Sequence, residues 1–90
     1  MSIVNIFTRY NTIKAEVINL TYVKRIRDLR EDHDKTQQQI ADVLKTSQTM
    51  YARYERGANE MPIHHLITLC KYYNVSADYI LGLSDHINKK

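Results

Sequence analysis

Basic and amide side chains gather in one stretch of this 90-residue chain. Residues 35–57 contain four lysines and arginines against two acids, together with four glutamines. Lysine and arginine attract phosphate, while glutamine can pair with adenine, and arginine with guanine, through two hydrogen bonds. The chemistry open to this stretch is therefore non-covalent recognition of an anionic partner. The net charge of +3 at pH 7 permits such a partner without requiring one.

The residue types that catalyse reactions or bind metals form no such pattern. His64 and His65 are adjacent, so their side chains would point about 100° apart on a helix, and no second ligand pair lies at i, i+4 spacing. Cys70 shares an apolar helical stripe with Leu66 and Tyr73, which indicates a small core residue. No glycine-rich phosphate loop or Ser/His/Asp set occurs. The sequence predicts no enzyme, no cofactor and no metal site.

Composition limits the fold that carries these residues. The chain is 43% hydrophobic and 26% charged, as soluble globular proteins are. No apolar run approaches the roughly 18 residues of a membrane span. Two glycines and one proline favour an all-α fold, and the length suits one domain. A single cysteine and an N-terminus unlike a signal peptide predict a cytoplasmic protein without membrane contact.

Apolar side chains recur at helical spacing in five segments, which we expect to be helices. These segments are residues 22–32, a short stretch opened by Thr36 and ending near Leu44, residues 48–55, a stretch from Pro62 to about Tyr73, and residues 77–82. Thr36 and Ser47 are predicted N-caps of the second and third helices. Those two helices are joined by a turn of about three residues, which is the pattern of a helix-turn-helix.

Residues 22–83 resemble the Xre-type, phage lambda repressor-like helix-turn-helix DNA-binding domain family. The resemblance rests on an ordered set of short motifs. They are Ile26-Arg27-Asp28-Leu29-Arg30, Thr36-Gln37 with Ile40-Ala41, Ser47 followed by Tyr54-Glu55-Arg56-Gly57, Pro62 with Leu66, and the stretch from Tyr72 to Gly82. It implies an all-α, five-helix domain at residues 21–83, between an N-terminal extension at 1–20 and a short polar tail at 84–90.

The resemblance also implies roles for single residues. Gln48, Thr49 and Arg53 would contact bases from exposed positions of the recognition helix. Arg30 and Glu55 would form a structural ion pair. Candidates for contact with the DNA backbone are basic and small polar residues around the two helices. They are Lys35, Thr36, Gln37, Lys45, Ser47, Arg56 and Asn59.

The function implied is that of a sequence-specific DNA-binding transcriptional regulator. We expect a repressor that binds an operator in double-stranded DNA as a homodimer, with the helix at about 47–55 in the major groove. The alternative is a protein-interaction module, because some members of the family neutralise a toxin or bind a protein antagonist. Such an antitoxin-like protein would also bind DNA to regulate its own synthesis.

Two residues depart from the family pattern. A glycine usually follows the leucine in the turn between the second and third helices, whereas Lys45 follows Leu44 here. Either Lys45 adopts a left-handed conformation, at about 1–2 kcal/mol, or the turn differs. Tyr51 stands where a branched aliphatic residue is usual, and its hydroxyl needs a partner if it is buried.

Residues 1–20 lie outside the resemblance. Their apolar residues recur at alternating spacings of three and four, like a heptad seam, namely Ile3, Ile6, Tyr10, Ile13, Val17 and Leu20. Ile13, Ala15 and Val17 instead alternate as in a strand, and several asparagines and threonines disfavour a helix. The structure of this extension stays open. It either forms part of a dimer, binds a partner, packs on its own domain or has no fixed structure.

Overall fold

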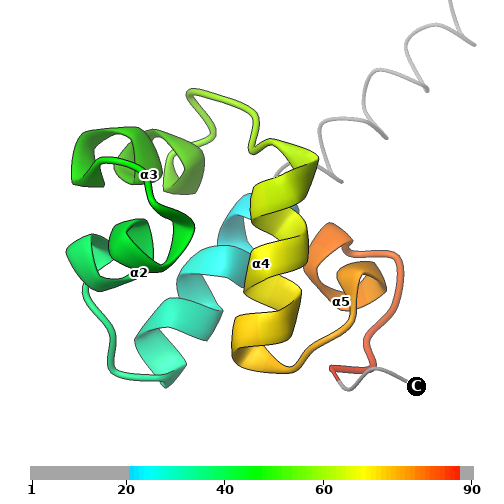
Figure 1. The fold of residues 1–90 in the computed structure, drawn as a ribbon. Helices are drawn as coiled ribbons and strands as arrows, with labels where there is room; N and C mark the ends of the chain where they lie inside the picture. Colours follow the sequence, from blue (N-terminus) through cyan, green and yellow to red (C-terminus); the bar gives the residue numbers. More distant parts are fainter. Residues whose placement is uncertain (1–20, 88–90) are drawn as a thin grey trace, which may run out of the picture.

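The computed structural model describes residues 21–87, and no strand occurs among them. Residues 21–32 are helical, and four further helices follow: α2 (Gln37–Leu44), α3 (Gln48–Glu55), α4 (Ile63–Tyr73) and α5 (Ala77–Leu81). In Figure 1, α4 stands between the α2–α3 pair and α5. The prediction of an all-α, five-helix repressor-like fold is confirmed. The expectations for residues 1–20 lie outside the described residues.

One apolar core joins all five helices. Ile26 of the helix at 21–32, Ile40 of α2, Tyr51 of α3, Leu69 of α4 and Ile80 of α5 are completely buried. Each comes from the apolar stripe of its own helix, so the helical spacing in the sequence becomes a set of inward-facing surfaces. Burial of one such side chain stabilises the fold by roughly 1.5–3 kcal/mol, and this core fixes where α2 and α3 lie.

Side-chain caps set the first residue of α2 and of α3. The Thr36 hydroxyl accepts the Gln39 N–H at 3.0 Å, and the Gln39 side chain accepts the Thr36 N–H at 2.8 Å, which completes a capping box. The Ser47 hydroxyl accepts the Met50 N–H at 3.0 Å. Both predicted N-caps are confirmed, and each contributes about 1 kcal/mol to the helix that it starts.

The turn between α2 and α3 is closed by a lysine in a left-handed conformation. Lys45 has φ 58° and ψ 42°, and it forms the C-cap of α2. Its N–H donates to Asp42 O at 3.2 Å, and the next N–H, that of Thr46, donates to Ala41 O at 3.0 Å. The first of the two alternatives for Lys45 is therefore correct: the turn keeps its short geometry with a side chain where glycine has none.

Hydrogen bonds extend past residue 83, where the sequence suggested that the domain ends. The Arg25 guanidinium lies 4.2 Å from the centre of the Tyr79 ring and donates to Ser84 O at 2.7 Å. The Ser76 N–H donates to Ile87 O at 3.2 Å. Residues 84–87 therefore lie against the helix at 21–32 and the start of α5, because Arg25 offers several donors to the carbonyls that follow α5.

Replacing Lys45 by glycine is expected to stabilise the domain by about 1 kcal/mol, because glycine adopts the left-handed conformation without a Cβ clash. In a domain of this size the melting temperature would rise by roughly 4–8 °C, measured by circular dichroism. Lys45→Ala is the control, since it removes the same side chain but keeps the clash. Equal melting temperatures for the two variants would contradict this explanation of the turn.

Candidate nucleic-acid interface

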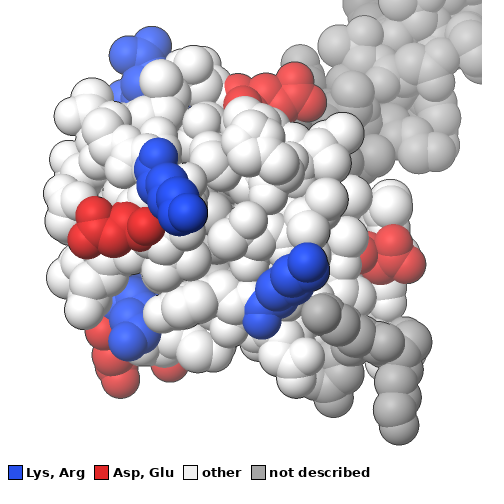
Figure 2. Space-filling view, in the orientation of Figure 1, with Lys and Arg blue, Asp and Glu red and all other residues white. Residues whose placement is uncertain are grey.

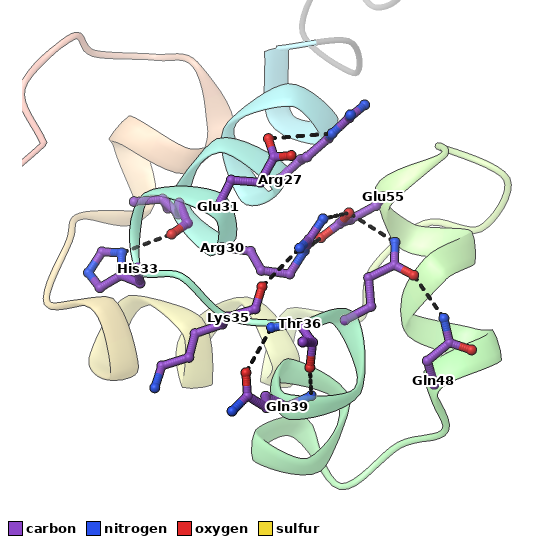
Figure 3. A network of polar contacts seen from close by, with 11 residues as sticks. Arg27, Arg30, Glu31, His33, Lys35, Thr36, Gln39, Gln48 and Glu55 are labelled. Carbon is purple, nitrogen blue, oxygen red and sulfur yellow. Dashed lines mark hydrogen bonds and ion pairs between the residues drawn. The ribbon is translucent and has the colours of Figure 1, made fainter.

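A bidentate ion pair joins α3 to the first helix, at residues 21–32. Arg30 Nε lies 2.6 Å from Glu55 Oε2, and Arg30 Nη2 lies 3.0 Å from Glu55 Oε1. The side chains are only 14% and 4% exposed, respectively. Arg30 Nη1 also donates to Lys35 O at 2.9 Å, so the same guanidinium holds the residues before α2 (Figure 3). Such a bidentate pair fixes geometry as well as charge.

The environment of Glu55 keeps it ionised. Burial by itself would raise the pKa of the Glu55 carboxyl. The hydrogen bond from Arg30 outweighs this effect, aided by Tyr51 and Gln37, and holds the pKa below its usual 4.5. Glu55 therefore stays negative at neutral pH and can only accept hydrogen bonds.

Tyr51 lies beside this pair in the core. Its ring meets that of Tyr54 edge-on, with 6.5 Å between the ring centres. Burial, and then the interaction with the adjacent Glu55 carboxylate, raise the pKa of the Tyr51 hydroxyl. Glu55 is thus near enough to affect this hydroxyl, yet the Tyr51 oxygen meets hydrogen-bond geometry with no residue among 21–87. Glu55 is therefore the acceptor that faces this hydroxyl, as the sequence led us to expect, although their contact falls outside strict hydrogen-bond geometry.

Two glutamine amides continue the chain of hydrogen bonds from Glu55 to the recognition helix. Gln37 Nε2 donates to Glu55 Oε1 at 3.1 Å, and Gln48 Nε2 donates to Gln37 Oε1 at 2.8 Å. Because a carboxylate only accepts, the NH₂ group of Gln37 must face Glu55. The oxygen of Gln37 then faces Gln48 and requires a donor there. The direction of every bond from Arg30 to Gln48 is therefore determined (Figure 3).

A second pair positions Arg53, one turn further along the exposed face of α3. Arg53 Nε donates to Oδ1 of Asn59 at 2.8 Å, and Asn59 lies in the loop that follows α3. The sequence suggested Asn59 as a phosphate contact and gave no partner for Arg53. The six-residue separation across the end of a helix has no periodic signal that could have revealed this pair.

The other residues chosen from the sequence surround these two pairs. Thr36 and Ser47 cap α2 and α3, so each hydroxyl accepts a backbone N–H and keeps its own proton for another acceptor. Thr49, Lys45 and Arg56 are exposed. The structure thus brings Arg30, Gln37, Gln48 and Glu55 into one network, which the carbonyl of Lys35 joins, and Arg53 and Asn59 into another. The side chains of the remaining candidates lie outside both networks.

On the face that Figure 2 shows, lysine and arginine side chains are separated from one another, and some of them lie beside acidic side chains. No group of three histidine, cysteine, aspartate or glutamate side chains within residues 21–87 could hold a metal ion. In the same part of the chain, no helix is long and apolar enough to cross a membrane. Recognition by this domain would depend on individually placed donors.

The helices and contacts that form this site fall within one stretch of sequence. Residues 26–80, more than half of the chain, match a family model described as helix-turn-helix. The chain belongs to the helix-turn-helix family. The resemblance noted from the sequence motifs is thereby confirmed, and α2, the turn at Lys45 and α3 are the helix, turn and helix of this member.

Three relatives illustrate the range of this helix-turn-helix family. YobD of Bacillus subtilis (strain 168), an uncharacterized HTH-type transcriptional regulator, is 38% identical over 69 residues, or 77% of this chain and 62% of YobD. The cryptic phage CTXphi transcriptional repressor RstR of Vibrio cholerae is 27% identical over 70 residues, or 77% of this chain and 63% of RstR. The antitoxin PezA of Streptococcus pneumoniae serotype 4 is 32% identical over 65 residues, or 72% and 41%.

The helix-turn-helix chain matches less than two thirds of the length of each of these relatives. No solved structure matches it.

Arg30 is largely buried, and replacing Glu55 by glutamine removes the carboxylate that pairs with it. We therefore expect the free energy of unfolding at pH 7 to fall by roughly 3 kcal/mol. The pKa of Glu55 is lower in the folded state than its usual 4.5. Its contribution is therefore complete above pH 4.5 and disappears as the pH falls through the folded pKa. Urea unfolding at pH 7 and pH 3 should show the difference between the two proteins shrinking on acidification.

Glu31→Gln is the matched control. It removes an equivalent carboxylate from an exposed pair, in which Arg27 Nε lies 3.6 Å from Glu31 Oε1. Exposed pairs contribute about 0–1 kcal/mol, so this variant should unfold close to the unchanged protein at both pH values. A deficit for Glu55→Gln of the same size at pH 7 and pH 3 would show that its cause is not the charge of Glu55.

Proposed function

We propose that the protein is a sequence-specific transcriptional repressor that binds an operator with α3 in the major groove. The observation that carries this proposal is the pairing of Gln48 with Gln37 and of Arg53 with Asn59. In each pair one polar atom is held by the domain while the remaining hydrogen-bonding groups of the α3 side chain are left for a ligand. It acts in the cytoplasm by binding, without a cofactor and without enzymatic activity.

Gln48 has the groups that read adenine. One proton of its NH₂ group goes to Gln37 Oε1, which leaves the second N–H and the side-chain oxygen unused in that contact. An adenine in the major groove offers N7 as acceptor and N6–H as donor. The amide orientation set by Gln37 therefore supports a two-bond contact with adenine, at about 1–3 kcal/mol of discrimination against another base.

Arg53 has the groups that read guanine. Its Nε is occupied by Asn59, so both terminal nitrogens of the guanidinium remain for O6 and N7 of guanine. Thr49 lies between the two readers in sequence and is exposed, and its hydroxyl or methyl group suits a thymine edge. Together these three side chains give a reading surface on one face of α3.

The backbone contacts proposed for this mode use the start of α2 and of α3. The hydroxyl protons of Thr36 and Ser47, and the unpaired N–H groups of the first turns, are donors for phosphate oxygens. Lys35 and Lys45 add charge beside these turns. Such contacts position the domain on the duplex, whereas the α3 side chains distinguish sequences.

Selection of binding sites from random DNA tests the assignment of the readers. Gln48→Ala and Arg53→Ala should each lose preference at one defined base position, by about 1–3 kcal/mol, while non-specific affinity is largely kept. Gln38→Ala is the matched control, because Gln38 is an exposed glutamine of α2 that pairs with Asp42. Selection of the same motif with the same strength by all the variants would remove Gln48 and Arg53 from this role.

The similarity to the antitoxin PezA favours a second candidate function. In that case the protein would bind a toxin or another protein antagonist and use its DNA contacts to control its own synthesis. The N-terminal extension at residues 1–20 is the segment we assign to either dimerisation or partner binding. A repressor of this kind reads two half-sites about 34 Å apart, and so acts as a homodimer.

Deleting residues 1–20 separates the two uses of the extension. If it forms part of the dimer, light scattering should give the mass of one truncated chain for the deletion variant and the mass of two full chains for the unchanged protein. Circular dichroism of the truncated protein serves as the control for folding. A folded truncated protein that remains a dimer would assign dimerisation to another surface and favour partner binding for the extension.

A further inference from the structure

Arg27 has no role in the function proposed above, yet it lies beside the reading network. Together with Arg30, Gln37, Glu55 and Arg56 it lines a cleft of about 160 Å³. The cleft lies between the first helix, the start of α2 and the end of α3. Its volume is several times the roughly 30 Å³ that a water molecule occupies in the liquid, so a phosphate group can enter it.

The balance of charge in this cleft is positive. Glu55 is the carboxylate that lines it, and the bidentate bond to Arg30 already neutralises that charge. Arg56 is exposed, and its guanidinium has no hydrogen bond or ion pair with any residue in the described part of the chain. Arg27 pairs with Glu31 at 3.6 Å, where the two side chains are 62% and 52% exposed. An exposed pair of this kind is weak, so a stronger anion can replace Glu31.

The cleft is also continuous with the proposed base reader. Gln37 lines it and at the same time accepts a hydrogen bond from Gln48 at 2.8 Å. In a major groove about 12 Å wide, a side chain that reaches a base edge stands close to the phosphates of the groove wall. An anion in the cleft would therefore lie one side chain away from the group that reads the base. This continuity favours a DNA phosphate over a carboxylate of a protein partner.

We propose that this cleft binds a single phosphodiester of the DNA backbone between Arg27 and Arg56. The inference rests on the proposed function and adds a contact that the sequence did not suggest, since Arg27 alternates with acids along its helix. Arginine presents a planar set of donors that matches phosphate oxygens. Because Gln37 forms part of the cleft and bonds to Gln48, the bound phosphate helps to position the domain on the duplex without itself distinguishing bases.

The experiment uses the full chain and the operator that it selects, with affinity measured by fluorescence anisotropy between 50 and 200 mM KCl. Arg27→Gln and Arg56→Gln should each lower the slope of log K against log salt by about two for the dimer, one for each subunit, so that the loss of affinity over this range becomes about sixteenfold smaller. Base preference should be unchanged. Lys24→Gln is the matched control, because Lys24 is an exposed cation of the same helix that pairs with Asp28.

A second measurement tests whether the two arginines share one phosphate. Operators that carry one uncharged methylphosphonate linkage each are bound by the unchanged protein and by both variants. At one linkage in each half-site the unchanged protein should lose affinity, and at that same linkage both variants should lose much less than the unchanged protein does. Salt slopes equal to that of Lys24→Gln would overturn the proposal, as would a reduced sensitivity at different linkages in the two variants. Neither result would contradict the proposed function. Failure of the unchanged protein to select an operator would overturn both.

Discussion

The arrangement of this domain depends on one interaction, the buried ion pair between Arg30 and Glu55. Two charges with little access to water stabilise a fold only when their remaining hydrogen-bonding groups are also used. Here the remaining donor of Arg30 holds Lys35 O, and the remaining capacity of Glu55 holds the Gln37 amide. The pair thus holds the residue before Thr36 and the end of α3 against the first helix, and it determines which atom Gln37 presents to Gln48. The two charges of Arg30 and Glu55 therefore both stabilise the fold and orient the side chains that we propose for recognition.

Local signals in the sequence explain how much of the fold could be predicted. Thr36 and Ser47 act within three residues of themselves, so their capping roles follow from spacing alone. The sequence did not decide between two conformations of Lys45. Tertiary packing offsets the strain of a left-handed residue, and no local pattern reveals that packing. The sequence predicts a tail from residue 84 onward, since the Ser84 carbonyl that accepts a hydrogen bond from Arg25 carries no sequence signal.

The sequence predicted which residues belong to the candidate site better than it predicted the hydrogen bonds between them. Family positions pointed to Gln48 and Arg53, but the atoms they offer depend on contacts between side chains far apart in sequence. The Gln37–Gln48 bond joins residues eleven positions apart, and the Arg53–Asn59 bond crosses the end of a helix. No sequence pattern singles out Arg27, because acidic residues alternate with the basic residues of its helix. Only the packing of three elements places it with Arg56.

The fixed direction of the hydrogen bonds limits how this domain can acquire new specificities. Because Gln37 presents its oxygen to position 48, a residue that replaces Gln48 there must supply a proton. Asparagine, serine, lysine and arginine satisfy this requirement, whereas aspartate and glutamate would set one acceptor against another. Carboxylates are the side chains that accept a hydrogen bond from cytosine N4. Evolution of a cytosine reader at this position would therefore have to begin with a change at Gln37, one helix away from the base.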